Sequence, residues 1–557
     1  MTHIPSRDEQ GRIDPDSVPD DVLADRVGPE SAGSLTGLAT RASSAAGIQM
    51  AVTKSFAVLT TLLTGGILSQ ADYGAAGTAL GIVVGLTVLQ PWVFADVLMA
   101  DPGSLPRRVD RAQRLAGGFG VLQAALIAGS IPVVMHLRPE DAQLPALLAA
   151  LALRPLFDAM LVKPLAALRY RLDVVKAPTV DGLAGMLANA GSVCMALSGA
   201  AAISIILPQV LATAARAVAY RHLSIRLPAA DPPSDQDRAF LVRSFLWGGL
   251  GAYVVSFLQM SETLVMSWFA VPAEVIGVFT FAYLIASQVT TVMATQVAGS
   301  LHPLFSHMQG DGVRMSGAFL RVVRVLGCLV VPFSIAQAAA SPALFPLIWG
   351  EKWLSAIPVF VAVSTAQAAS FALPTVSLML KAQGRFKAML LLNATYAGIA
   401  VALYSAICGL SRPWASAASQ FGIAEQSLIP TSIALGNALT LMVLGPIALK
   451  IALPRETRGS TGCSGAYFLP FVVTLPIGAV TYLAVNEVSR GLQTDRLALS
   501  TIVLIAFGVT FLFGSLVSAR MSESAWNDLS EMLRRLLVRL HLHRFLRGVG
   551  SRARPRE

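Results

Sequence analysis

Long apolar runs, separated by short charged spacers, dominate the chain from residue 44 onward. A bilayer core of about 30 Å requires about 20 apolar helical residues to cross it. Runs of that length predict fourteen membrane-spanning helices, at residues 44–69, 75–99, 113–136, 143–167, 178–198, 200–219, 241–269, 275–299, 318–341, 354–380, 387–410, 423–450, 467–486 and 496–519. The pattern therefore predicts an all-α polytopic membrane protein.

The composition excludes several other classes of protein. Charged residues make up 13% of the 557 positions and hydrophobic residues 54%. Soluble proteins carry about 25% charged residues, so this chain has too little charge to cover a water-facing surface. The sequence contains no HExxH, P-loop or Gly-x-Ser-x-Gly motif. We therefore expect no catalytic activity, no bound cofactor and no direct use of ATP.

The basic residues gather on one side of the predicted spans. With a cytoplasmic amino terminus, 35 of the 42 Lys and Arg residues lie in cytoplasmic segments and five lie in outer segments. The positive-inside rule then predicts both termini on the cytoplasmic side of the cytoplasmic (inner) membrane. The net charge of +10 accordingly faces anionic lipid headgroups, and no nucleic-acid partner is expected.

The spacers also predict a domain organisation with two comparable halves. We expect an acidic disordered cytoplasmic tail, an N-terminal six-helix lobe, a cytoplasmic linker, a C-terminal six-helix lobe, two additional transmembrane helices and a basic amphipathic cytoplasmic helix, at residues 1–43, 44–221, 222–240, 241–452, 467–519 and 520–557, respectively. Six spans per half give the two lobes the same orientation, as in transporters built from parallel repeats.

A short sequence echo supports the division into halves. Residues 69–74 (SQADYG) open the second span of the first half, and residues 272–277 (PAEVIG) open the second span of the second half. Both contain an acidic residue followed by a glycine, at equivalent positions. The echo favours an internal repeat, although Asp and Gly are also common in short turns that are unrelated to any repeat.

Four segments of the second half carry a resemblance to a known family. They are GVFTFAY at 277–283, HPLFS at 302–306 with Gln309 and Asp311, WGEKW at 349–353 and KAQGR at 381–385. In order and spacing they resemble the Wzx-type polysaccharide flippases of the multidrug/oligosaccharidyl-lipid/polysaccharide exporter superfamily. Residues 68–80 resemble that family's first half, and the resemblance covers residues 44–450.

The resemblance implies both an architecture and a substrate class. Members of this family have two six-helix lobes that face each other across a central cavity, and spans thirteen and fourteen would be the two extra helices. Their substrates are lipid-linked sugars, moved from the inner to the outer leaflet of the cytoplasmic membrane. A polysaccharide polymerase and an export machinery are the partner proteins that such a role implies.

Two cations lie deep inside predicted spans. A charged side chain at mid-bilayer costs about 2.5–3.5 kcal/mol on insertion scales, so such residues face protein or a wet cavity. Lys54 lies in the first span and Arg154 in the fourth. Because Lys and Arg pair with phosphate oxygens, we expect Lys54 and Arg154 to line the cavity and bind the substrate diphosphate.

Two carboxylates lie in the same kind of position. Asp158 follows Arg154 by four residues, and Glu262 lies in the outer half of the seventh span. They are candidates for coupling transport to H⁺ or Na⁺. A structural alternative pairs Arg154 with Asp158 at i, i+4 and Lys54 with Glu262, since spans one and seven would be equivalent.

Two other functions remain as alternatives at the level of the sequence. A multidrug exporter of the same superfamily would share the architecture, but a carrier of organic cations favours an acidic cavity. A membrane-embedded glycosyltransferase, ligase or polymerase needs catalytic side chains on its outer face. The longest outer loop here, at residues 410–423, carries a single Arg and no carboxylate pair, which disfavours that class.

Overall fold

The computed structural model describes nine stretches of the chain: residues 52–87, 93–99, 105–170, 176–223, 235–288, 312–419, 425–453, 462–491 and 495–522. Helices make up nearly all of these residues, and no strand occurs among them. The helices are, in chain order, Val52–Ile67, α3 (Gln70–Leu86), α4 (Val93–Met99), α5 (Leu105–Leu137), α6 (Leu144–Ala152), α7 (Arg154–Met160), α8 (Val162–Tyr170), α9 (Lys176–Leu197), α10 (Ile203–Leu223), α11 (Asp235–Trp268), Ala273–Gln288, α13 (Gly312–Trp349), the 3₁₀ turn η3 (Gly350–Trp353), α14 (Ala356–Ala369), α15 (Leu373–Ala382), α16 (Phe386–Ser419), α17 (Glu425–Ala452), α18 (Gly462–Gly491) and α19 (Arg496–Arg520).

The prediction of an all-α polytopic membrane protein is confirmed. Ten helices in the described part of the chain are long and apolar enough to cross a membrane, and an eleventh span is formed if the bent pair Leu144–Met160 and Val162–Leu168 counts as one. The first, second and eighth predicted spans fall on shorter helices that border residues outside the described ranges. The number fourteen is therefore not confirmed.

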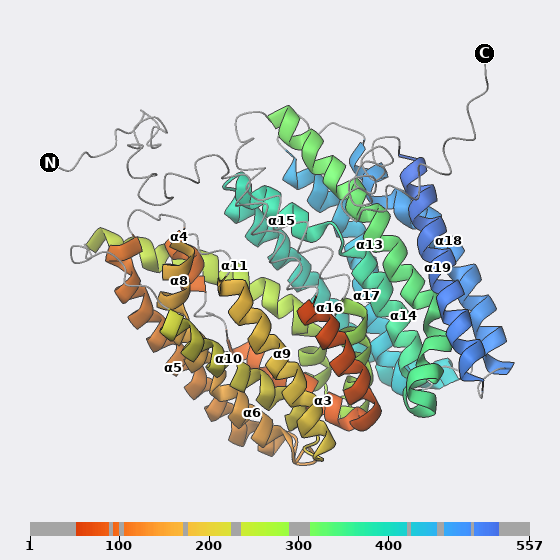
Figure 1. The fold of residues 1–557 in the computed structure, drawn as a ribbon, viewed down its shortest axis with the longest axis horizontal. Coiled ribbons are helices and arrows are strands. Elements are labelled where there is room, and N and C mark those ends of the chain that lie inside the picture. Colours follow the sequence, from red (N-terminus) through yellow and green to blue (C-terminus); the bar gives the residue numbers. More distant parts are fainter. Residues whose placement is uncertain are drawn as a thin grey trace, which may run out of the picture.

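The helices form two groups that lie side by side (Figure 1). Helices α3 to α10 make up the first group, and α13 to α17 lie in the second, with α18 and α19 packed on the outer side of α13. Helix α11 joins the groups because it packs against α3 and α4 on one side and against α16 on the other. The acidic tail (1–43), most of the linker (222–240) and the basic segment after Ser522 lie outside the described residues.

The fourth span of each half contains a short turn near its middle. In the first half the turn at Leu153 separates α6 from α7, Pro155 occupies the first turn of α7, and the bend of 41° lies further along, between Met160 and Val162. In the second half the turn separates α14 from α15, and Pro374 occupies the first turn of α15. Proline is tolerated in a first turn, where the missing N–H has no partner within the helix. The two turns fall on the spans that a six-plus-six repeat would make equivalent.

The sequence echo has a different structural basis in each half. Ser69 caps α3, and Asp72 accepts hydrogen bonds from the Ser69 backbone N–H at 2.9 Å and from its hydroxyl at 2.7 Å. Asp72 is thus a buried capping residue, whereas Glu274 in the second half is exposed. The two glycines of the echo, Gly74 and Gly277, do play matching roles, because each lies where the two helices touch.

Candidate functional site

Lys54 lies between the two halves. Its ammonium is half-buried and donates a long hydrogen bond, 3.5 Å, to the side-chain oxygen of Gln288 at the end of helix Ala273–Gln288. Lys54 precedes Ile67, the last residue of its helix, by thirteen residues, which places it about 20 Å from that end.

Arg154 directly follows the turn at Leu153 in the fourth span. It is the first residue of α7, and its guanidinium lies 3.6 Å from the carboxylate of Asp158, one turn further along. The expected i, i+4 pair therefore forms. The Arg154 side chain is 45% exposed against 18% for Asp158, so the guanidinium keeps donors free to meet another group. Arg154 follows Leu144, the first residue of α6, by ten residues, about 15 Å along the helices.

Glu262 of α11 is fully buried within the second half. Its Oε1 accepts a hydrogen bond from the Asn437 amide of α17 at 3.1 Å and a longer one, 3.5 Å, from the Tyr404 hydroxyl of α16. The Tyr396 hydroxyl donates to the Asn437 carbonyl oxygen and so fixes the orientation of that amide. The second oxygen, Oε2, is buried and has no hydrogen-bond partner. A carboxyl group in this setting has one oxygen available for a proton or a small cation.

The alternative pairing of Lys54 with Glu262 is wrong. Lys54 contacts Gln288 and Glu262 contacts Asn437. The distances from the helix ends explain the difference, because Glu262 precedes the end of α11 by six residues, about 9 Å, whereas Lys54 lies about 20 Å from the corresponding end of its helix. Equivalent helices need not bring their charged residues to one level.

Several residues of this region were not predicted from the sequence. Asn437, Tyr396 and Tyr404 surround Glu262, and Tyr283 of helix Ala273–Gln288 lies within electrostatic range of it. An asparagine inside an apolar span was the available signal, since polar side chains in membrane helices usually seek a partner. Among the described residues, no group of three or more His, Cys, Asp or Glu side chains could hold a metal ion.

Comparison with known protein families finds a match over half of the chain. Residues 66–358 match a family described as "Polysaccharide biosynthesis protein". The teichuronic acid biosynthesis protein TuaB of Bacillus subtilis (strain 168) is 24% identical over 110 residues, which are 20% of this chain and 23% of TuaB. The match therefore spans less than a quarter of that relative's length.

Two solved structures share the fold. A structure of the lipid II flippase MurJ in an inward closed conformation has a TM-score of 0.55 and 12% identity, covering 85% of this chain and 98% of MurJ. An inward-facing multidrug resistance MATE family transporter of the MOP superfamily has a TM-score of 0.51 and 12% identity, covering 72% and 96%. At such identities the likeness concerns the fold alone. Since the family match covers more than half of its length, the chain belongs to the polysaccharide biosynthesis protein family of Wzx-like proteins.

Proposed function

We propose that this protein flips lipid-linked oligosaccharide diphosphates from the inner to the outer leaflet of the cytoplasmic membrane, by alternating access, for polysaccharide biosynthesis. The family match over residues 66–358 is the observation that carries the proposal. The fold shared with the lipid II flippase MurJ is consistent with it. The protein would act as a transporter and not as an enzyme.

The positions of two cations support a diphosphate substrate. An anionic headgroup must cross a low-dielectric slab while its lipid tail stays among lipids, and cations along the path lower that barrier. Lys54 lies in the first helix, where it contacts the second half, and Arg154 is the first residue of α7, directly after the turn at Leu153. Many transporters bind substrate near the bilayer midplane, at spans whose helix is interrupted. The corresponding turn before α15 would complete the site from the second half.

The orientation and the partners are part of the same proposal. The distribution of Lys and Arg supports cytoplasmic termini in an inner membrane. The ends of α5 and α9 and the turn η3 would then face outward, so the substrate would be released among them. A polysaccharide polymerase that consumes the delivered units is the expected partner, together with the lipids around the helices.

Glu262 and Asp158 are the groups proposed to couple transport to a gradient of H⁺ or Na⁺. Glu262 has the stronger case, because its buried Oε2 has no hydrogen-bond partner and its Oε1 is held by Asn437 and Tyr404. Asp158 already lies beside Arg154. When the diphosphate binds to Arg154, the ion pair between Arg154 and Asp158 would weaken.

Reconstitution tests the substrate role of Arg154. The protein is placed in vesicles with a labelled polyprenyl-diphosphate oligosaccharide, and transfer is followed by protection of the glycan from a membrane-impermeant oxidant. Arg154→Ala should reduce the transfer rate by at least about tenfold, since a charge-assisted hydrogen bond contributes about 1.5–3 kcal/mol. Arg490→Ala is the matched control, because Arg490 forms an exposed i, i+3 pair with Glu487 on α18.

A double variant separates the substrate role from the structural one. If Arg154 serves only to neutralise Asp158, then replacing both residues by alanine should restore transfer. If Arg154 binds the diphosphate, the double variant stays inactive and Arg154→Lys retains part of the rate. Efflux of a cationic dye with no transfer of the lipid-linked glycan would instead support the multidrug exporter, whose fold is the same.

A further inference from the structure

The two halves meet at one end of the molecule along a contact that we call the outer seam. It consists of α3 against helix Ala273–Gln288, and of the end of helix Val52–Ile67 against η3 and the last residue of α13. A Cβ on Gly74 would collide with the backbone carbonyl of Ala273, and a Cβ on Gly277 would collide with the carbonyl of Gln70. The second helix of each half therefore contacts its counterpart backbone to backbone.

The second half supplies a cap for the first helix. The ring N–H of Trp353 donates to the carbonyl of Gly65 at 2.8 Å, and the Lys352 ammonium donates to the carbonyl of Gly66 at 3.0 Å. The last four carbonyls of an α-helix have no donor within the helix, and a cation there also complements the helix dipole. The ring N–H of Trp349 adds a bond to the Leu62 carbonyl at 3.0 Å.

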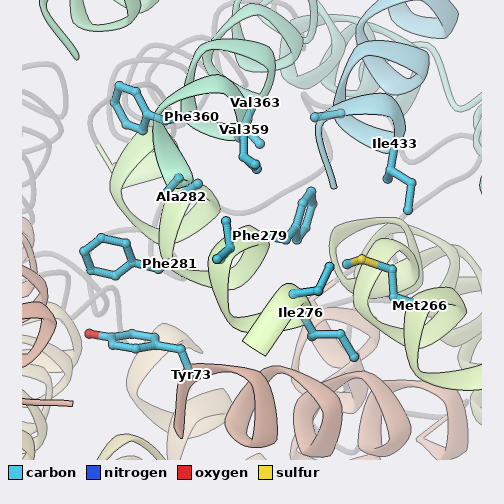
Figure 2. Packing of buried hydrophobic residues seen from close by; sticks show 14 of the residues in the cluster. Tyr73, Met266, Ile276, Phe279, Phe281, Ala282, Val359, Phe360, Val363 and Ile433 are labelled. Carbon is cyan, nitrogen blue, oxygen red and sulfur yellow. The ribbon is translucent and has the colours of Figure 1, made fainter. Parts of the chain in front are cut away.

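The seam is packed closely around these donors. Trp353 is fully buried and stacks on Phe281 with ring centroids 3.8 Å apart. Figure 2 shows Tyr73 of α3 beside Phe281 of helix Ala273–Gln288, with Phe360 of α14 above them. The Tyr73 hydroxyl shares a hydrogen bond of 2.7 Å with Thr64, in the last turn of the first helix. The carbonyl that Trp353 caps is thus enclosed by side chains from both halves.

We propose that η3 and the last residue of α13 form a latch: Trp349, Lys352 and Trp353 cap the first helix while the outer seam is closed, and opening the seam removes that cap. The inference rests on the proposed function only in that alternating access requires this seam to open. Separation would transfer the carbonyls of Leu62, Gly65 and Gly66 to water. Because Lys54 lies on the same helix, the state of the seam is transmitted to the end of the helix that carries a candidate substrate cation.

Spin labels across the seam test the latch without any transport measurement. Labels on Ser198, in the turn after α9, and on Glu487, near the end of α18, report the separation of the halves by pulsed electron resonance. Both side chains are exposed, and the labels are introduced after replacing the four native cysteines, Cys194, Cys328, Cys408 and Cys463, by alanine. The purified full chain is measured in lipid nanodiscs without substrate.

Trp353→Phe and Trp349→Phe keep a ring and remove only the donor. Each should raise the ratio of separated to closed molecules by about fivefold, because the loss of one hydrogen bond of average net strength changes an equilibrium constant by about that factor. The double variant should raise the ratio more than either single variant. Trp268→Phe is the control, since Trp268 is 84% exposed at the end of α11. Distance distributions for both single variants that match those of this control would overturn the latch.

A wedge at the glycine contact tests the seam itself. Gly74→Ala should shift most molecules to the separated distance, and Gly277→Ala gives a second, independent wedge. Gly66→Ala is the matched control, because no atom lies within 4 Å of the Cβ it would add. A closed distribution in both wedge variants, with folding verified by a monodisperse elution profile, would reject the seam as the moving contact. Shifted distances without glycan transfer would leave the latch standing and reject the flippase proposal.

Discussion

Replacing Glu262 by glutamine should remove coupling while leaving the fold intact. The carboxyl group is buried, and its Oε1 accepts from the Asn437 amide at 3.1 Å and from Tyr404 at 3.5 Å. Glutamine keeps an acceptor at that position and puts an amide nitrogen near the unpartnered Oε2. It has the same shape but cannot bind a proton or attract a cation.

The structure gives the size of the expected stability changes. Glu262→Gln should alter the free energy of unfolding by less than about 1 kcal/mol, since both donors keep their acceptor. Glu262→Leu removes the acceptor and leaves the Asn437 amide unsatisfied, which costs about 1–3 kcal/mol. Tyr404 adds less, because its hydroxyl already lies at 3.5 Å. The thermal midpoint of the leucine variant should therefore fall well below that of the glutamine variant.

Transport measured under imposed gradients completes the test. Vesicles carrying the wild-type protein should transfer glycan faster under a gradient of H⁺ or of Na⁺, whereas Glu262→Gln should show one low rate under every gradient. Glu487→Gln is the control, because the Glu487 side chain is 71% exposed on α18. A glutamine variant that still responds to the gradient would refute the coupling role. A glutamine variant as unstable as the leucine variant would refute the assignment of the hydrogen bonds.

Two further predictions concern stability. Gly445→Ala places a methyl group against the ring of Tyr467, so this variant should lower the free energy of unfolding by about 1–3 kcal/mol. The added methyl group of Gly398→Ala meets no atom within 4 Å, so that variant should raise the free energy of unfolding by up to about 1 kcal/mol. Equal thermal midpoints for the two variants would contradict this prediction. Burial raises the pKa of Asp141, although Arg138 beside it acts in the opposite direction. The folded protein then binds this proton more tightly than the unfolded chain, so the contribution of Asp141 is present at acidic pH and is lost as pH rises from about 3.8 through the raised value. Asp141→Asn should flatten that part of a plot of thermal midpoint against pH, and an unchanged slope would disprove the assignment.

The membrane fold could be predicted because one physical rule governs it. Each predicted span overlaps a helix in the structure, since a bilayer requires long apolar runs whose backbone groups are satisfied within the helix. The short turns before α7 and α15 were less visible in the sequence. Pro155 and Pro374 indicated a disturbance, but proline also occurs within helices that continue, such as α10 at Pro208. Neighbouring helices decide which of the two occurs.

The site was predictable as a set of residues and not as a set of contacts. Lys54, Arg154, Asp158 and Glu262 were identified from the cost of burying charge. The pair of Arg154 with Asp158 followed from local helix geometry, and the structure contains it. The partners of Lys54 and Glu262 depend on how far one helix is displaced along another, which the spacing within a single helix does not contain. Asn437 and Gln288 were missed for that reason.

Coupling requires that binding and opening affect each other, and the arrangement of α11 offers a route. Ser267, five residues after Glu262, donates to the Thr78 hydroxyl of α3 at 3.2 Å, across the two halves. Helix α11 also packs against α16, which carries Tyr404. Opening the outer seam would move α3 relative to α11 and change the surroundings of Glu262. By linkage, an ion or proton at Glu262 must then shift the seam by the factor with which opening shifts its affinity. Measuring both the ion affinity and the open fraction of the Trp353→Phe variant would show whether the latch sets the coupling. The ion affinity of the variant should change in the same sense as its open fraction.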